Sequence, residues 1–147
     1  MSKFLIKLLI FSCIVLFYNC GGGIKTIAID VMTEDDANGG NAVVVTIYQL
    51  VNADKFHYAS FESLMTKPEE TLGSDIIPNS KYVRTMVPGE NFQLQEYEIK
   101  NDAAYLGIVA DFHSPAKDGW QQVIPLESDF SELKISIHES SLSVAFD

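Results

Sequence analysis

The stretch AVVVTIYQLV, residues 42–51, carries the strongest β-strand signal in the chain. Most of its side chains are β-branched or aromatic, and such side chains fit the pleated, half-buried surface of a sheet. Both alternating sets are apolar: Val43, Val45 and Ile47 on one side, Val44, Tyr48 and Leu50 on the other. A strand that is apolar on both sides is typical of one with both faces covered. The stretch therefore predicts a central strand around which the chain is arranged.

Seven further segments are predicted as strands at short spacing: 25–32, 81–87, 92–99, 104–112, 121–126, 133–138 and 142–146. In the segment 92–99, simple alternation sets Phe92, Leu94 and Glu96 against Gln93, Gln95 and Tyr97. Gly107, inside a second apolar strand, predicts a close approach of another part of the chain. Many short strands separated by turn residues are typical of two packed sheets. The expected fold class is therefore mainly β, a β-sandwich of about eight strands with a short helical insertion.

The insertion is expected between residues 54 and 73, where the spacing is helical. Asp54 is placed to cap a helix over 54–66, Pro68 ends or restarts it, and 69–73 form a second turn closed by Gly73. Four side chains are predicted to form one apolar face: Tyr58, Phe61, Leu64 and Met65. Such a face predicts a helix packed on the sheet rather than a ligand site.

The charge balance excludes several classes of partner. The chain has 10 Lys and Arg against 20 Asp and Glu, a formal net charge of −10. Without Lys3 and Lys7, the only charged residues before position 20, 8 basic and 20 acidic residues leave −12. Nucleic acids and anionic lipid surfaces are bound by clustered Lys and Arg, and no such cluster follows Lys7. We therefore expect neither a nucleic-acid partner nor electrostatic membrane binding.

The N-terminus has the organisation of a signal peptide. Lys3 and Lys7 precede an apolar run over 8–18, which is too short to span a bilayer but suits the core of a signal peptide. Cys20 and three glycines follow, and this arrangement resembles the bacterial lipoprotein signal, in which the thiol is acylated. Cys13 is a rival site that leaves too short an apolar run. We expect a lipoprotein signal peptide at 1–19, a lipidated tether at 20–24 and a β-sandwich domain at 25–147.

The sequence carries no specific signature of catalysis or metal binding. His57, His113 and His138 are far apart, and neither HExxH nor paired cysteines occur. Asp111 and His113 could share one face of a strand, which leaves a hydrolase as one hypothesis; exposure at a strand end is the other interpretation. Trp120 is interpreted as an aromatic that covers the sandwich rim, with an interface anchor as the alternative. We expect no enzyme activity, no cofactor, no metal and no small-molecule substrate.

An acidic loop, TEDDANGGN at 33–41, separates the first strand from the central one. Glu34, Asp35 and Asp36 repel one another, so we expect the tip of the loop to lie in solvent. The loop is longer than a simple hairpin connection, and long loops on a rigid sheet are often functional. We also expect that deleting 35–40 leaves stability nearly unchanged, as is usual for an exposed loop.

Several pieces in this order resemble the TssJ (VasD) family of outer-membrane lipoproteins of type VI secretion systems. The similar features are Cys20, VVVTIYQL at 43–50, Phe56, Ala59, Phe61 and Leu64, Leu72-Gly73 with Asp75, Pro88-Gly89-Glu90, LGIVA between Ala104 and Phe112, and Trp120. The resemblance implies a transthyretin-like sandwich with added helices, anchored by lipid on the periplasmic face of the outer membrane. It also implies a partner, the periplasmic C-terminal domain of the inner-membrane protein TssM, so that the two membranes are linked.

The resemblance further implies that the loop between the first two strands contacts this partner. That loop maps to Thr33, Glu34, Asp35, Asp36, Ala37, Asn38, Gly39, Gly40 and Asn41. The alternative from another class is a periplasm-facing lipoprotein that binds a small ligand or glycan through its loops. A deep apolar pocket with convergent polar groups would favour this alternative.

Overall fold

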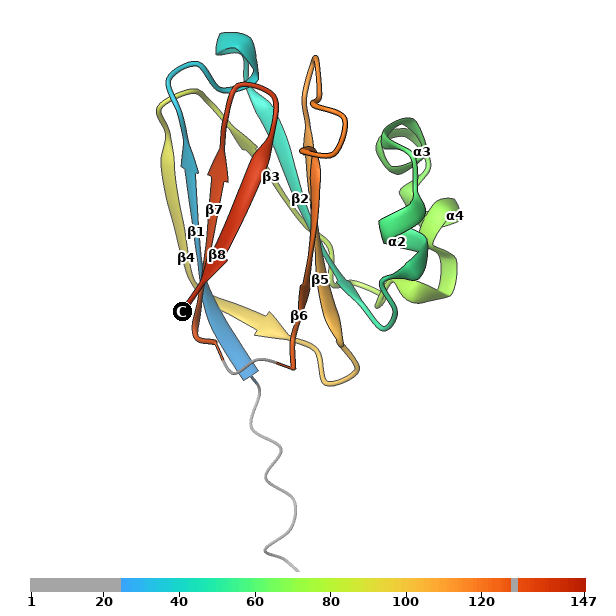
Figure 1. Ribbon diagram of the computed structural model, residues 1–147. Coiled ribbons are helices and arrows are strands. Elements are labelled where there is room, and N and C mark those ends of the chain that lie inside the picture. The colour runs from blue at the N-terminus through green and yellow to red at the C-terminus, as the bar shows by residue number, and fades with distance from the viewer. Residues whose placement is uncertain (1–24, 128–129) are drawn as a thin grey trace, which may run out of the picture.

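The computed structural model describes residues 25–127 and 130–147, and it contains two four-stranded sheets that face each other (Figure 1). Sheet I has the order β4-β1-β7-β8 and sheet II the order β3-β2-β5-β6. The strands are β1 Lys25–Thr33, β2 Val43–Leu50, β3 Tyr82–Met86, β4 Asn91–Ile99, β5 Tyr105–Asp111, β6 Gln121–Pro125, β7 Glu132–Ile137 and β8 Leu142–Phe146. β1 and β7 pair in parallel and the other neighbours are antiparallel. The predicted mainly-β sandwich of about eight strands is confirmed.

β2 is the inner strand of sheet II, as its two apolar faces predict. It pairs with β3 on one side and β5 on the other, and seven of its eight residues are buried. Val43, Val45 and Ile47 are buried in the same apolar cluster as Ile29 and Val31 of β1. The opposite face of β2 is covered by the helical insertion.

Strict alternation fails in β4 because the strand contains a bulge. Ile27 pairs with Tyr97 but Ile29 pairs with Leu94, so β4 has one residue more than β1 over this interval. The extra residue reverses which side chains face the core beyond it. Phe92 and Leu94 face the interior as expected, but Glu96 is exposed while Tyr97 is buried. The prediction that Glu96 shares a face with Phe92 was therefore wrong.

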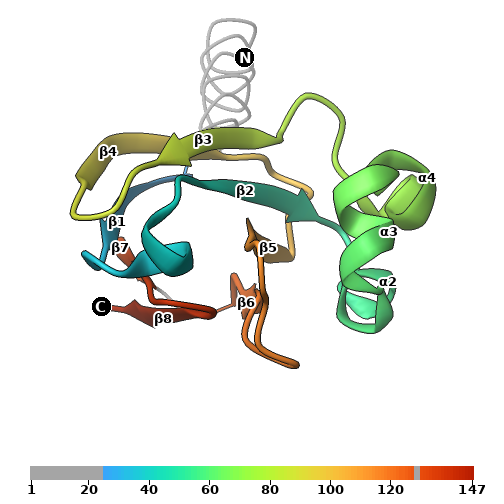
Figure 2. The same ribbon diagram turned by 90° about the horizontal axis from the view of Figure 1, so that it is seen from above.

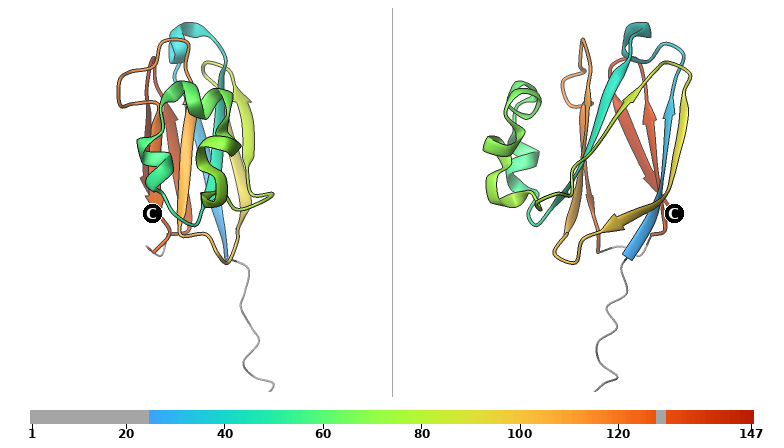
Figure 3. Two further views of the ribbon diagram at one scale, coloured as in Figure 1. Left: turned by 90° about the vertical axis from the view of Figure 1, so that its right-hand side faces the viewer. Right: turned by 180° about the vertical axis from the view of Figure 1, so that it is seen from behind.

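The insertion consists of three short helices, not the single helix expected over 54–66. They are α2 Asp54–Tyr58, α3 Phe61–Thr66 and α4 Pro68–Leu72, and they lie on the outer side of sheet II (Figures 2 and 3). Ser60 interrupts the helix because its hydroxyl accepts a hydrogen bond from the N–H of Ser63, which starts α3. Pro68 begins α4 and Gly73 closes it, as predicted.

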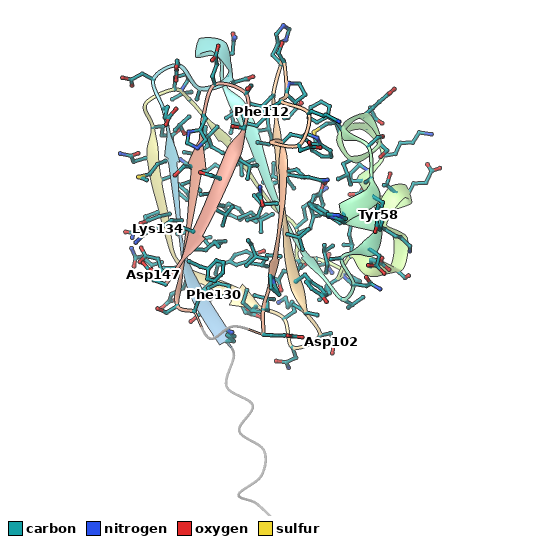
Figure 4. All side chains as sticks on the ribbon, viewed as in Figure 1. Tyr58, Asp102, Phe112, Phe130, Lys134 and Asp147 are labelled. Carbon is teal, nitrogen blue, oxygen red and sulfur yellow. The ribbon has the colours of Figure 1, made fainter. Side chains whose placement is uncertain are left out.

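The break changes which side chains of the insertion are buried. Phe56 is fully buried, whereas Tyr58 is 83% exposed and points away from the sheets (Figure 4). Tyr58 was therefore wrongly assigned to the apolar face, while Leu64 is buried and Phe61 and Met65 pack against the core. Asp54 is the first residue of α2, and its N–H is bound by the side chain of Asn52; the expected capping role of Asp54 was also wrong.

Gly107 of β5 provides the seat for this insertion. A Cβ at this position would lie 2.6 Å from Cε2 of the Phe56 ring. No residue with a side chain fits there unless the ring moves, so the predicted close approach at Gly107 is confirmed. The Phe56 ring also meets Tyr48 of β2 edge to face, with ring centroids 6.2 Å apart.

The two ends of the sandwich carry different segments. β1 begins at Lys25 at the lower end in Figure 1, and the β1–β2 loop lies at the upper end. We call the upper end the loop end; it comprises the β1–β2, β3–β4, β5–β6 and β7–β8 connections. We call the other the Lys25 end. No helix within the described residues is long and apolar enough to cross a bilayer.

Candidate functional site

The β1–β2 loop is a compact structure built on left-handed backbone. A short 3-10 element occupies Ala37–Gly40, and Asn38, Gly39 and Gly40 have φ of 51°, 62° and 80°. Glycine adopts this conformation without a steric penalty, and asparagine tolerates it better than most residues. The two glycines and Asn38 thus turn the chain back toward β2 in a few residues.

Asn38 connects the loop to two other connections of the loop end. Its side-chain oxygen accepts a hydrogen bond of 2.7 Å from the N–H of His113 in the β5–β6 connection, and its Nδ2 donates one of 2.7 Å to the carbonyl of Ala42. Its own N–H donates to the carbonyl of His138 in the β7–β8 connection, at 3.3 Å. Asn38 is 6% exposed, so one buried amide fixes the relative position of three connections.

Glu34 provides a second link to the β7–β8 connection. Its carboxylate lies 2.8 Å from Nδ1 of His138, whose Nε2 lies 2.9 Å from the hydroxyl of Ser143. The backbone N–H of Glu34 donates to the carbonyl of Ile137. The start of the loop is therefore joined to the end of β7 and to β8.

The turn between β3 and β4 supports the loop from the other side. The N–H of Gly89 donates to the carbonyls of Thr33 and Glu34, at 3.1 and 3.2 Å. Gly89 has φ of 75°, and a Cβ there would lie 2.8 Å from a carboxylate oxygen of Asp35. The Pro88-Gly89 turn thus needs its glycine for both conformation and contact.

The loop therefore differs from the solvated tip that its composition predicts. Glu34, Asp35 and Asp36 are exposed as expected, but Ala37 is fully buried and Asn38 nearly so. Thr33 is also buried and belongs to β1. The three carboxylates lie in solvent, which weakens their mutual repulsion. Ala37 and Asn38, which follow them, are buried beneath the loop.

The surface of the loop end is strongly acidic. Among the ion pairs of the described residues, Asp35, Asp36 and Glu139 form none. Glu90 is compensated: a hydrogen bond from the N–H of Val87, and then one from Arg84 at 2.7 Å, lower the pKa of its carboxyl group. The uncompensated carboxylates make this end of the molecule complementary to a positively charged surface.

The structure does not join Asp111 and His113 into a catalytic pair. Asp111 ends β5 on the outer face of sheet II, in a hollow that it shares with Val44 and Val83. His113 lies in a different hollow, beside Asn38 and Glu139. No hydrogen bond joins the two side chains within the described part of the chain, where no three His, Cys, Asp or Glu side chains gather to hold a metal ion either. The hydrolase hypothesis gains no geometric support.

A groove that the sequence did not predict lies between the insertion and β6. It has a volume of about 740 Å³ and is bounded by residues of the α2–α3 junction, the β5–β6 connection and β6. Trp120 is only 6% exposed and meets Phe61 edge to face at 5.2 Å between ring centroids. Trp120 is therefore packed against the insertion, which favours the interpretation as a covering aromatic over that as an interface anchor. The groove forms where Trp120 packs against Phe61 of the insertion. This contact joins distant parts of the chain, so the sequence could not predict the groove.

Comparison with known proteins identifies the family. Residues 25–140 match the family model described as type VI secretion lipoprotein, VasD, EvfM, TssJ. The chain belongs to this family. It is a family of secretion lipoproteins and not one of enzymes, and the predicted lipoprotein signal agrees with it. Cys20 itself, with the predicted signal peptide at 1–19 and tether at 20–24, lies outside the described residues.

Chains in solved structures of type VI secretion proteins share the fold. TssJ1 of Pseudomonas aeruginosa is 18% identical over 85% of this chain and 98% of its own, with a TM-score of 0.76. A chain of a type VI membrane complex is 26% identical, covers 84% and 99%, and has a TM-score of 0.74. A chain in a structure described as the TssM C-terminal domain from EAEC is 24% identical, covers 83% and 98%, and has a TM-score of 0.71. No curated protein sequence matches.

Proposed function

We propose that this type VI secretion lipoprotein is anchored through Cys20 to the periplasmic face of the outer membrane and binds the periplasmic C-terminal domain of TssM through its β1–β2 loop. The protein then links the outer membrane to an inner-membrane component of the secretion apparatus. The observation that carries the proposal is the placement of the loop, residues 33–41, at the end of the sandwich opposite the start of β1.

This placement suits a tether. β1 has nine residues, Lys25–Thr33, and an extended strand rises about 3.3 Å per residue, so it spans roughly 30 Å. A lipid on Cys20, five residues before Lys25, holds the Lys25 end near the membrane. The loop end then faces the periplasm, where a partner from the inner membrane reaches it.

The comparisons support the choice of partner. Two of the similar chains come from structures described as a type VI membrane complex and as the TssM C-terminal domain. The alternative, a lipoprotein that binds a ligand or glycan, calls for a deep apolar pocket with convergent polar groups. The groove beside β6 is open and lined by both polar and apolar residues, so it gives that alternative less support.

The acidic surface suggests how the partner is recognised. Exposed carboxylates of one sign raise the rate at which an oppositely charged surface associates, and salt screens this effect. We therefore infer a basic patch on the TssM domain opposite Asp35 and Asp36. Binding should weaken as the salt concentration rises, mainly through a slower association rate.

The test is affinity capture of the TssM periplasmic domain by the double variant Asp35→Asn with Asp36→Asn, which leaves the contact between Glu34 and His138 in place. We expect at least about a tenfold weaker complex, as for interfaces that lose several complementary charges. A deletion of 35–40 is unsuitable because, contrary to the expectation from sequence, it would remove the buried Ala37 and Asn38.

The matched control is the double variant Glu96→Gln with Asp102→Asn. It changes the net charge equally, but its residues are exposed and form no ion pair among those found in the described chain. Asp102 lies at the Lys25 end (Figure 4). Equal capture by both double variants and the wild type would refute the loop as the contact. Fractionation of a Cys20→Ser variant, which should leave the outer membrane, tests the anchor in the same cells.

A further inference from the structure

β6 is an edge strand of sheet II whose free side carries unpaired backbone groups. The N–H of Ala110 donates to the carbonyl of Trp120, and that of Leu126 to the carbonyl of Ala104. In the register of β5 and β6, these contacts make Gln122 and Ile124 the residues that bond to β5. Gln121 and Val123 therefore direct their N–H and C=O groups away from β5. Neither residue's backbone takes part in any other hydrogen bond found in the described chain.

β6 borders the groove on the face that its Gln121 and Val123 side chains share with the insertion. Residues 121–123 form one boundary of the groove, and Ala59 and Phe61 of the α2–α3 junction belong to the opposite one. The other edges differ: β4, for example, carries the bulge and the exposed charges of Glu96 and Glu98. Charged side chains and bulges protect edges from pairing. β6 lacks charged residues, and its one protective feature is Pro125 at its end.

The side chain of Gln121 adds a second unsatisfied group at this place. Its Nε2 donates to the carbonyl of His57 across the groove, at 3.3 Å. Its amide oxygen is buried and has no hydrogen-bond partner among the described residues. A buried polar atom without a partner is uncommon in native proteins.

The groove is continuous with the loop end. The β5–β6 connection, whose Lys117 and Asp118 line the groove, is held by two backbone hydrogen bonds. The N–H of Ala116 donates to Ser140 of the β7–β8 connection, and the N–H of Leu142 at the start of β8 donates to Gly119. The same β5–β6 connection donates the His113 N–H to Asn38 of the β1–β2 loop. A polypeptide bound at the loop end therefore reaches the β6 edge without leaving the surface.

We propose that an extended segment of the partner adds to the free edge of β6 as a fifth strand of sheet II, beside this groove. The inference rests on the proposed function, since the segment belongs to the partner bound at the loop end. Main-chain hydrogen bonds provide affinity in such strand addition, and alternate side chains provide specificity.

The free edge of β6 determines the length of the bound segment and the character of its side chains. Gln121 and Val123 offer two outward donors, and these residues with Pro125 offer three outward acceptors, so about five residues are bound. The side chains of Gln121 and Val123 face the insertion, as Gly107 opposite Val123 does. Side chains of the added strand on that face meet Ala59 and Phe61 and should be apolar or small.

A second copy of this chain fits less well. Antiparallel pairing of two β6 strands by a two-fold axis places both helical insertions on the same face of the joined sheet, one on each side of the seam. Each insertion already bounds the groove beside its own β6, so the two insertions would compete for the space along the seam. A single extended strand from a partner carries no helical insertion and can lie beside β6.

Amide hydrogen exchange of the full complex tests the inference without any substitution. In the free protein, the amides of Gln121 and Val123 should exchange fast, while those of Gln122 and Ile124 are protected by β5. Binding of the TssM periplasmic domain should slow exchange at Gln121 and Val123 at least about tenfold, because both acquire hydrogen bonds. Unchanged exchange at both amides in the complex overturns the inference.

Val123→Pro provides the matching substitution. It removes an outward N–H and spares the bonds to β5, and proline is tolerated at such edge positions. We expect about tenfold weaker binding, the range for one lost hydrogen bond plus a steric block. The control Val123→Thr keeps the N–H and the β-branched shape and should bind within about twofold of the wild type.

The outcomes separate the two proposals. If neutralising the loop carboxylates weakens capture while Val123→Pro and the exchange of both amides show no effect, the tether stands and strand addition fails. If the loop variant has no effect either, the proposed function fails. Protection that grows with the concentration of the lipoprotein alone would assign the edge to a second copy. Protection by a chito-oligosaccharide probe would assign the groove to a glycan. Either result overturns the strand addition.

Discussion

The β1–β2 loop and the helical insertion are the two large additions to the same sandwich, and they are attached by opposite means. The loop is held by polar contacts, chiefly the amide of Asn38 and the carboxylate of Glu34. The insertion is held by apolar burial, with Phe56, Leu64 and Leu72 at most 1% exposed. The polar attachment fixes a defined shape while leaving carboxylates on the outside. The apolar attachment forms a rigid support on the far face of sheet II.

The energies of the two attachments differ accordingly. Full burial of one large apolar side chain contributes about 1.5–3 kcal/mol, whereas a typical hydrogen bond contributes a net of about 1 kcal/mol. The insertion should therefore remain folded under conditions that loosen the loop. Hydrogen exchange and stability measurements can examine each attachment separately.

The largest effect on stability is expected from Gly107→Ala, which disturbs the apolar attachment of the insertion. The new Cβ would lie 2.6 Å from the Phe56 ring, so the ring and the insertion must shift. Overpacking of this kind costs about 1–3 kcal/mol, and we expect the upper end of that range in the free energy of unfolding measured with denaturant. The rigid β5 backbone beneath Gly107 cannot relieve the contact.

A double-mutant cycle with Phe56→Leu makes this prediction specific. Phe56→Leu alone should destabilise the protein because it leaves a cavity. Combined with Gly107→Ala, the smaller side chain leaves room for the new methyl group, so the double variant should lose less than the sum of the two. Additive losses would show that the close contact is not what makes glycine necessary at 107.

The local patterns that the sequence displays determined most of the fold. β2 could be predicted because its apolar and β-branched residues fit no other element. The close approach at Gly107 could be predicted because a glycine inside a buried strand often marks the place where another part of the chain comes near the backbone. The bulge in β4 could not be predicted, because it depends on the register with β1. The break at Ser60 was missed because the apolar spacing around it continues across the interruption.

The candidate site was predicted in position but not in structure. The loop at 33–41 could be located because its acidic and glycine residues interrupt two strands. Its contacts join residues 75 and 104 positions apart, Asn38 with His113 and Glu34 with His138. No local pattern reports such pairs. The groove beside β6 was missed for the same reason, since it forms only where the insertion meets a strand about 60 residues later.

A second, smaller effect on stability is expected at alkaline pH from Tyr48, which packs against Phe56 of the insertion. Burial, and then the charge of Glu69, raise the pKa of Tyr48 from 10.0 to about 12. The neutral phenol is thus favoured in the folded state, and the unfolded state loses its proton first. The contribution of Tyr48 is intact below pH 10 and is lost between pH 10 and 12, by about 2 kcal/mol at the upper limit.

Tyr48→Phe isolates this effect, because it keeps the ring that meets Phe56. Burial also raises the pKa of Tyr97, and lysines titrate in the same range. The difference in unfolding free energy between Tyr48→Phe and the wild type is therefore the quantity to measure. It should move in favour of Tyr48→Phe as the pH rises from 9 to 12. A constant difference would show that Tyr48 ionises equally well in the folded protein.

The smallest effect is expected from Asn38→Gly, which attacks the polar attachment. Glycine keeps the backbone at φ of 51°, but the two side-chain hydrogen bonds to His113 and Ala42 are lost. We expect a loss of about 1–2 kcal/mol in unfolding free energy. Because Asn38 positions the exposed carboxylates, the amides of the loop should also exchange faster while those of β2 do not.

Asn38→Ala separates the contribution of the side-chain amide to stability from that of the left-handed backbone. It loses the same hydrogen bonds and in addition must hold a left-handed conformation, which costs alanine about 1 kcal/mol more than glycine. The expected order of stability is wild type, then Asn38→Gly, then Asn38→Ala. Were Asn38→Gly as stable as the wild type, the backbone bonds of Glu34 and Gly89 alone would hold the loop. The loop carboxylates would then keep their positions without the buried amide, and capture of the partner would be unaffected by its loss.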